Sequence, residues 1–271
     1  MIARPRNLTL CADDFGQSKS ITEGILDLIA CRRLTATSVL TEGPYWPEGA
    51  QRLRDMQDRT DVGVHLNLTH AFPTTIGSRS LFYWLIATQT GRVAADKIKE
   101  RFLRQIDLFA QHFRRLPDFI DGHQHVHAFP VIRQAMMEAI ELRWPVQKGR
   151  PWVRTPDRLI DDSGSQLKTL VLRYACRGFS NFVEQNGLKF TQHFGGLYAL
   201  NANANFEGRM RGWLEQTPNG TLLMCHPGRP ANDYADPIAG ARSVEFSYLV
   251  SPRFHDDCQR YGIRLVRFSD H

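Results

Sequence analysis

The sequence predicts an α/β fold built from parallel strands, either a (β/α) barrel or a doubly wound sheet. Short apolar runs alternate with amphipathic segments along the 271 residues, and polar side chains follow the ends of several runs. No internal repeat or long linker interrupts this alternation. A hydrophobic content of 42% and a charged content of 23% are ordinary for a soluble globular protein. We therefore expect a single domain over residues 1–271.

Eight short apolar runs are candidate strands. In chain order they are Leu8–Ala12, Ala36–Leu40, Val62–Leu66, Asp118–Asp121, Trp152–Thr155, Lys189–Gln192, Thr221–Cys225 and Ile263–Phe268. In a (β/α) barrel the carboxyl ends of the strands form one face, and the active site lies on that face. Polar residues at the ends of separate runs are therefore expected to meet.

Helical periodicity fills the segments between these runs. Ser20 and Glu23 have the spacing of a capping box, which predicts that a helix begins there. Pro130 suits the first turn of another helix, and Ser251-Pro252 predicts a last helix that ends near Gly262. The apolar residues at three- and four-residue steps are Ile21, Ile25, Leu28 and Ile29, then Ile98, Phe102, Ile106, Phe109 and Phe113, then Ile132, Met136 and Ile140.

The charge distribution argues against a nucleic-acid-binding protein. The net charge of +6 is mild, and Lys and Arg are scattered with no run of five or more. A slightly basic surface suits an anionic substrate or contact with a membrane surface. No apolar stretch has the 18 or so residues that a transmembrane helix needs.

The cysteines indicate a reducing compartment. They are five in number and far apart, and no CxxC pair occurs, which argues for free thiols. The first apolar run, Leu8–Ala12, leads directly into Asp13-Asp14, so we interpret it as a strand and not as a signal peptide. We expect a cytoplasmic protein, and the sequence leaves a homodimer open.

Three histidines at alternate positions are the most specific feature of the chain. His123, His125 and His127 lie within Asp121-Gly-His-Gln-His-Val-His127. A neutral imidazole is the commonest metal ligand, and three on one face are costly to bury without a function. An incidental surface cluster is the alternative. We expect His123, which is nearest to the strand end, to bind a metal.

Two other strand ends carry the same chemistry. Asp13-Asp14 follows the first run, so one carboxylate can bind a metal while the other faces a bound water; the alternative is a turn or a helix cap. His65 ends the third run as a further candidate ligand, although a lone histidine there can also be a hydrogen-bonded core residue. Asn67 has the same alternation as His65 and is a candidate substrate contact.

The second half of the chain offers three candidates for catalysis and binding. His226 in Cys225-His-Pro-Gly228 is a candidate general acid, although Pro-Gly alone would only be a turn. Arg154 can bind a substrate carboxylate or position Asp13, and an ordinary surface arginine is the alternative. The aromatic segment Leu81–Leu85 is either a stacking surface for sugar or lipid or part of a buried helix.

Four motifs, in this order, resemble those of the YdjC-like carbohydrate deacetylases. They are Ala12-Asp-Asp-Phe-Gly16, Gly63-Val-His-Leu-Asn-Leu-Thr69, Asp121-Gly-His-Gln-His-Val-His127 and Cys225-His-Pro-Gly228, and Thr37-Ser38 also fits the pattern. The resemblance covers the whole chain. It implies a distorted (β/α) barrel of the polysaccharide-deacetylase, or glycoside hydrolase/deacetylase, type.

The resemblance also implies an activity, the removal of N-acetyl groups from small amino sugars such as chitooligosaccharides. Asp13 corresponds to the catalytic base, Asp14, His65 and His123 to the metal ligands, and His226 to a second catalytic residue. The stretch His193–Tyr198 resembles the branch of the family found with hopanoid-lipid biosynthesis. For that branch the substrate is an acetylglucosaminyl lipid. Independently of the branch, Asn67, His125 and Arg154 are the candidate substrate-binding residues.

Two histidines and one aspartate leave metal positions open for water and substrate, as a catalytic site requires. This donor set suits one Zn²⁺, while Mg²⁺ usually prefers oxygen ligands but is not excluded. One alternative function is another metal-dependent barrel hydrolase, acting on a phosphoester or a lactam, which would want several basic residues at the strand ends. A second is a non-catalytic sugar- or lipid-binding protein, which would need no base at residue 13.

Overall fold

Parallel strands form one curled sheet in the computed structural model, which describes residues 5–75, 77–91, 93–146, 149–160, 166–231 and 235–270. The order across the sheet is β5-β4-β3-β2-β1-β7-β6, and β8 pairs with the beginning of β1. The strands are β1 (Arg6–Phe15), β2 (Ala36–Val39), β3 (Asp61–Leu66), β4 (Phe119–Gly122), β5 (Trp152–Val153), β6 (His193–Gly195), β7 (Thr221–Cys225) and β8 (Ile263–Leu265).

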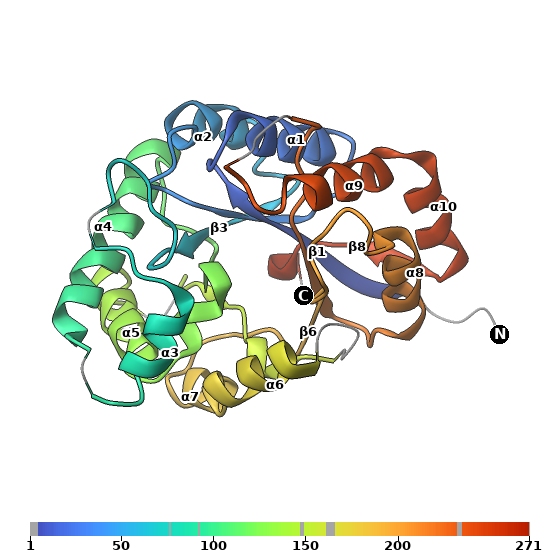
Figure 1. Cartoon of the computed structure of the whole chain (residues 1–271). Coiled ribbons are helices and arrows are strands. Elements are labelled where there is room, and N and C mark those ends of the chain that lie inside the picture. Colours follow the sequence, from blue (N-terminus) through green and yellow to red (C-terminus); the bar gives the residue numbers. More distant parts are fainter. Residues whose placement is uncertain are drawn as a thin grey trace.

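Backbone bridges connect the two edges of this sheet. The amide N–H of Val153, in β5, donates to the carbonyl of Lys189 at 2.9 Å, and that of Ile160 donates to the carbonyl of Phe194, in β6, at 2.9 Å. The sheet is therefore curled into an irregular ring with helices around its outside (Figure 1). This arrangement confirms the predicted distorted (β/α) barrel.

The helices cover the outer surface of the barrel. They are α1 (Lys19–Ala30), α2 (Trp46–Arg54), α3 (Leu81–Ala87), α4 (Ala95–Phe113), α5 (Ile132–Arg143), α6 (Gln166–Ala175), α7 (Phe179–Gln185), α8 (Phe206–Gln216), α9 (Ala239–Val250) and α10 (Pro252–Arg260). The predicted apolar repeat of α4 is buried, and Trp46 of α2 stacks on Phe109 with ring centroids 5.3 Å apart. No helix in the described part of the chain is long and apolar enough to cross a membrane.

Strand bounds differ from the prediction, most of all in β1, which runs to Phe15 and so contains Asp13 and Asp14. Three other local predictions also differ from the structure. The sixth strand is His193–Gly195 and not Lys189–Gln192, because only Phe190 of the predicted run pairs, in an isolated bridge to Val153. Helix α1 is capped by Ser18, whose hydroxyl accepts from the N–H of Ile21, while Glu23 of the predicted capping box pairs with Arg52. Helix α5 begins at Ile132, two residues after Pro130.

A bulge near the end of β1 determines where the first motif points. Ala12 pairs with Thr37 of β2, but Phe15 pairs with Val39, so β1 carries one extra residue between these pairs. The extra residue falls at Asp13-Asp14, and Asp14 has a φ of 69°, in the left-handed region. Bulges re-aim side chains and are common beside active sites. Here the bulge lets two adjacent carboxylates line the same cavity.

Candidate active site

A cavity of about 630 Å³ lies at the carboxyl ends of the strands. Its polar lining comes from separate elements: β1, β3, the turn η1 (His123–Ala128) after β4, and the residue after β7. Its apolar lining includes Leu81, Leu85, Leu197, Leu200 and Ile238. The predicted meeting of strand-end polar groups is thus found in a cavity whose walls are largely apolar.

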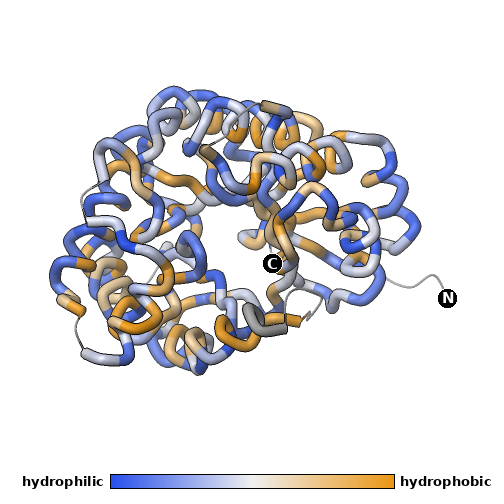
Figure 2. Tube along the Cα trace, viewed as in Figure 1, coloured by the Kyte–Doolittle hydropathy of each residue, from blue (hydrophilic) through white to orange (hydrophobic). Residues whose placement is uncertain are grey.

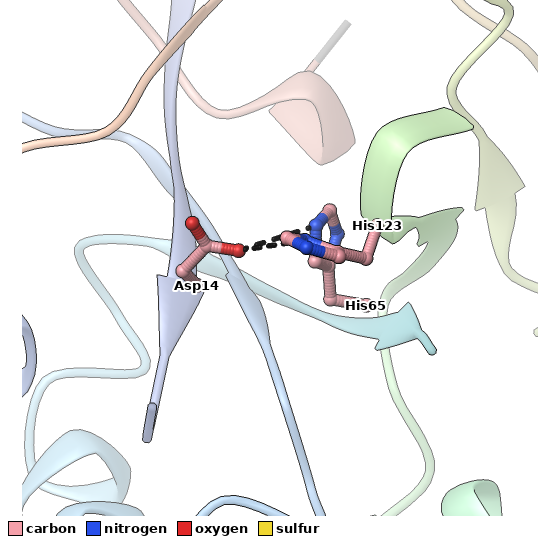
Figure 3. A group of neighbouring side chains, drawn as sticks. All are labelled: Asp14, His65 and His123. Atoms are coloured by element: carbon pink, nitrogen blue, oxygen red, sulfur yellow. Dashed lines mark hydrogen bonds and ion pairs between the residues drawn. The ribbon is translucent and has the colours of Figure 1, made fainter. Parts of the chain in front are cut away.

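Asp14, His65 and His123 converge in this cavity (Figure 3). Their ligand atoms all lie within 4.8 Å of one another. Oδ1 of Asp14 is 3.1 Å from Nδ1 of His123 and 3.6 Å from Nε2 of His65. One carboxylate and two imidazoles form a donor set that suits a borderline divalent cation such as Zn²⁺. The structure therefore brings together the three residues predicted as metal ligands.

His65 is oriented from behind by Asp121, a residue to which the sequence assigned no role. Oδ1 of Asp121 lies 2.7 Å from Nδ1 of His65, and the hydroxyl of Ser38 contacts both groups. Burial alone would lower the pKa of His65, but Asp121 and Asp13 raise it above its ordinary value. A carboxylate on one ring nitrogen fixes the orientation of a metal-binding imidazole and leaves the other nitrogen facing the metal.

The second oxygen of Asp14 is held by Arg242 of α9. Nη2 of Arg242 donates to Oδ2 of Asp14 at 2.8 Å, and its Nε donates to Asp236 at 2.6 Å. Burial would raise the pKa of Asp14, but Arg242 and then His123 lower it well below its ordinary value. Arg242 and Asp236 belong to none of the four motifs, and no sequence signal singled them out.

Arg154 holds Asp13 in a fully buried ion pair. Its two terminal nitrogens donate to Oδ2 and Oδ1 of Asp13 at 2.7 and 2.6 Å, and Nη2 also lies 2.5 Å from Oδ2 of Asp121. Burial would raise the pKa of Asp13, but the Arg154 guanidinium lowers it below its ordinary value. Arg154 is 0% exposed, so of the two predicted roles the geometry favours the positioning of Asp13 over contact with substrate.

His226 faces Asp13 across the base of the cavity. Its Nε2 lies 3.9 Å from Oδ2 of Asp13, and burial lowers the pKa of His226 to about 4. Its backbone N–H donates to Glu245 at 2.5 Å, and the hydroxyl of Tyr198 donates to the same carboxyl at 2.5 Å. Burial raises the pKa of Glu245 to about 7. Glu245, on α9, is another contributor to the site that the sequence did not indicate.

Of the other histidines and polar residues considered from the sequence, one lines the cavity and two make hydrogen bonds outside it. His125 lines the cavity, and burial lowers its pKa well below the ordinary value. His127 points away from it and approaches the carbonyl of Arg154 with Nε2 at 2.9 Å. Asn67 does not contribute to the cavity lining either, because its amide is used within its own loop: it accepts from the N–H groups of Thr69 and His70 and donates to the carbonyl of His70.

Two further cavity residues carry polar atoms that suit a substrate. Oε1 of Gln17 and Oγ1 of Thr69 are buried and have no hydrogen-bond partner within the described structure. Buried polar atoms normally have partners, so a ligand in this cavity is expected to supply them. In the aromatic segment Leu81–Leu85, Trp84 is buried and Leu81 and Leu85 line the cavity, while Phe82 and Tyr83 are exposed, so the segment is not a buried helix.

A family model described as "YdjC-like protein" matches residues 7–260, which is nearly the whole chain. The chain belongs to the YdjC-like protein family. The family resemblance predicted from the four motifs is therefore confirmed.

Curated relatives of this YdjC-like protein include two deacetylases. The human protein named "Carbohydrate deacetylase" is 28% identical, over 99% of this chain and 92% of that protein. The "Chitooligosaccharide deacetylase" of Serratia marcescens is 25% identical, over 97% and 98%. Among solved structures, a protein of Enterococcus faecalis V583, described as a candidate cellobiose-phosphate cleavage protein, has a TM-score of 0.72 at 20% identity, with 98% of both chains covered. The structural likeness shows a shared fold.

Proposed function

We propose that this YdjC-like protein is a carbohydrate deacetylase that hydrolyses the N-acetyl amide of an amino sugar. One observation carries the proposal: Asp13, Asp14, His65, His123 and His226 converge at the base of a single cavity. The names of the human and Serratia relatives, which cover nearly the whole chain, support the same reaction.

The donor set at Asp14, His65 and His123 fits one divalent cation. All three groups are arranged around one point, and the arginine and carboxylate behind them are already engaged with Asp14 and His65. When bound, such a cation polarises the acetyl carbonyl and lowers the pKa of water. Two imidazoles with one carboxylate favour Zn²⁺, and Mg²⁺ is the alternative. A second cluster, Cys11, Asp13 and Asp121, does not fit a cation because the guanidinium of Arg154 already contacts all three.

Asp13 and His226 carry the proton in this proposal. Asp13 accepts a proton from the attacking water, with its carboxylate held in place by Arg154. His226 is neutral at pH 7 before the reaction, because burial lowers its pKa to about 4. The pKa of Asp13 is lowered below its ordinary value, so Asp13 passes the proton on to the neutral Nε2 of His226. The two atoms are 3.9 Å apart, so the transfer needs them to approach to hydrogen-bond distance or to be bridged by one water. His226 then donates it to the nitrogen that leaves.

The structure weighs against both alternative functions. A phosphoesterase needs free cations to bind phosphate, whereas Arg154 and Arg242 are each paired with two carboxylates. A binding protein needs no base, whereas Asp13 is buried and held on both oxygens. No observation favours a lactam over an acetyl amide.

The substrate class follows from the cavity lining. The polar atoms of Gln17, Thr69 and His125 suit the hydroxyl and amide groups of a sugar. The apolar walls suit an amino sugar that carries an apolar group, so an acetylglucosaminyl lipid, such as a hopanoid glycolipid, fits better than a long chitooligosaccharide. We further propose that residues 1–271 are one domain and act in the cytoplasm, where the five free cysteines would stay reduced. We also propose that the protein forms a homodimer and contacts a membrane surface.

The test is release of acetate from a panel of N-acetylated amino sugars, including a short chitooligosaccharide and an acetylglucosaminyl lipid. We expect turnover with Zn²⁺ or Mg²⁺, loss after chelation, and recovery when the metal is returned. Asp13→Asn should lower turnover by about 10²–10⁴-fold in the same assay. Cleavage of a phosphoester, with no acetate from any sugar, would overturn the proposal.

A further inference from the structure

The exposed apolar side chains of this protein are concentrated on two helices. Of nine large hydrophobic side chains that are exposed among the described residues, six belong to α3 and α6. We call these six the rim patch: Phe82, Tyr83, Ile86, Leu170, Val171 and Tyr174. Phe82 and Tyr174 are 71% and 68% exposed, so each aromatic ring lies largely in water. Clustered exposed apolar side chains mark an interaction surface, whereas single ones need no explanation.

The rim patch adjoins the mouth of the cavity. Helix α3 also contributes Leu81 and Leu85 to the cavity lining, and α6 contributes Val171 and Leu172. Figure 1 shows the two helices on the same side of the ring, and Figure 2 shows hydrophobic stretches along both. The apolar surface therefore continues from the outside of the molecule into the cavity.

Neither helix of the rim patch carries an acidic side chain. The sequence contains no Asp or Glu from residue 62 to 95, the segment that includes α3, and none from 163 to 183, the segment that includes α6. Exposed basic side chains flank the patch: Arg79 before α3, and Arg173 and Arg177 at the end of α6. Arg79 lies over the Tyr83 ring, 5.9 Å from its centroid. A surface that is apolar at its centre and basic at its edge complements an anionic, apolar partner.

A lipid bilayer with anionic headgroups has both properties. Aromatic and aliphatic side chains enter the boundary between headgroups and acyl chains, and nearby Lys and Arg are attracted to anionic lipids. An acidic protein would satisfy the basic edge, but it gives no reason for an apolar surface that continues into the cavity. The observations therefore favour lipid over protein as the occupant.

We propose that the rim patch docks on an anionic membrane surface and places the mouth of the cavity against the lipid. Docking itself does not depend on the reaction. Its consequence, that the cavity receives an amino sugar carried on a lipid, rests on the proposed function. The protein would then be peripheral, held by a few side chains and by charge, and released by salt.

The test is co-sedimentation of the full chain with vesicles of phosphatidylcholine alone or with about 30% phosphatidylglycerol. We expect binding to the anionic vesicles at about 0.1 M salt and release at about 0.5 M, where charge is screened. The double variant Phe82→Ser/Tyr174→Ser should bind at least about tenfold more weakly, since each buried aromatic ring favours partitioning by roughly an order of magnitude. Val250→Ser is the matched control: Val250 is 38% exposed at the end of α9, away from the patch, and its loss should change nothing.

Two further measurements separate the outcomes. Turnover of a water-soluble N-acetylated sugar should be the same in the wild type and the double variant, so failure of the proposed reaction and failure of docking are seen in different assays. Sedimentation velocity of the protein without vesicles shows whether the rim patch instead joins two copies of the chain. Equal vesicle binding by the wild type and the double variant would overturn the proposal. So would a dimer of the wild type that the double variant abolishes without any vesicle binding, because the patch would then be an interface between two copies.

Discussion

The two halves of the chain contribute different parts of the active site. The first half, through β1, β3 and the turn after β4, supplies side chains that face the cavity: Asp13, Asp14, His65 and His123. The second half supplies mainly groups that hold them. Arg154 and Arg242 bind the two aspartates across 141 and 228 residues of sequence. His226, which follows β7, also faces the cavity, and Arg242 and Asp236 line it while they hold Asp14.

This difference explains why two adjacent carboxylates can have different functions. Each of the two aspartates has its own guanidinium, and the arginines come from different elements. Asp13 is shared between Arg154 and His226, and Asp14 is shared between Arg242 and the two histidines. In the proposed mechanism the second half therefore distinguishes the proposed base from the proposed metal ligand, although the first half contains both. The following predictions test this division.

The largest effect is expected from the side chains that face the cavity as candidate metal ligands. His65→Ala and His123→Ala should each abolish the stoichiometric binding of a divalent metal, because each removes one of three ligands. Elemental analysis after dialysis measures this. His112→Ala, on the outer helix α4, is a control that should keep its metal. Full metal content in both ligand variants would contradict the assignment.

Asp13→Asn should lower turnover by about 10²–10⁴-fold, the usual contribution of a general base, with metal content unchanged. The amide keeps the size of the side chain but cannot take the proton. Initial-rate assays with parallel metal analysis check both statements. A variant with most of its activity would show that Asp13 is structural and that the water has another base.

Arg154→Met and Arg242→Met test separately the two arginines that hold Asp13 and Asp14. Each leaves buried carboxylates unpaired and should cost about 3–5 kcal/mol of unfolding free energy in urea. Metal affinity should distinguish them: Arg242→Met should weaken it by about 10–100-fold, as is usual for groups behind metal ligands, and Arg154→Met much less. Equal losses of metal affinity would show that the two arginines support one shared network.

Glu245→Gln should change how stability depends on pH. Burial raises the pKa of Glu245 to about 7 in the folded protein, so the folded state binds more protons than the unfolded state between about pH 4.5 and 7. The stabilisation from this group is complete below about pH 4.5 and is lost as the pH rises through 7, by as much as about 3 kcal/mol. Urea unfolding at several pH values should show the variant gaining on the wild type across this range. A constant difference would contradict the buried neutral acid.

The smallest effect is expected at Asn67, which shapes the loop that carries Thr69 and His70. Asn67→Ala removes three hydrogen bonds, each worth about 1 kcal/mol, and should raise KM a few-fold with little change in kcat. Asn67→Asp keeps the two acceptor contacts and should be milder. A large fall in kcat with KM unchanged would place Asn67 in the chemistry.

The sequence predicts most of the barrel because its strands are short apolar runs with polar ends. The strand Thr221–Cys225 is predicted with the correct bounds, whereas β6 is displaced by a few residues because Phe190 and Phe194 both lie in an apolar setting and only pairing decides between them. The bulge in β1 has no local signal either, since it depends on the register with β2.

The facing groups of the site are predictable because each follows a strand within a motif. The residues that hold these side chains are not predictable in this way. Arg154 is the exception, because positioning Asp13 is one of the two roles that the sequence predicts for it. Arg242 and Glu245 are single polar residues on an otherwise ordinary helix, and only the three-dimensional structure places them beside Asp14 and His226. Both side chains are ionisable and buried, a combination that marks them in the structure and that the sequence alone does not show.

The long sequence separation between Asp14 and Arg242 has a consequence for synthesis of the protein. The three candidate ligands have all left the ribosome about 120 residues before Arg242, which at 5–20 residues per second is an interval of several seconds or more. During that interval the nascent chain contains a chelating group whose carboxylate has no guanidinium to neutralise it. A metal captured then would be bound before Arg242 is present, whereas a metal that binds after synthesis meets a carboxylate that is already paired with Arg242.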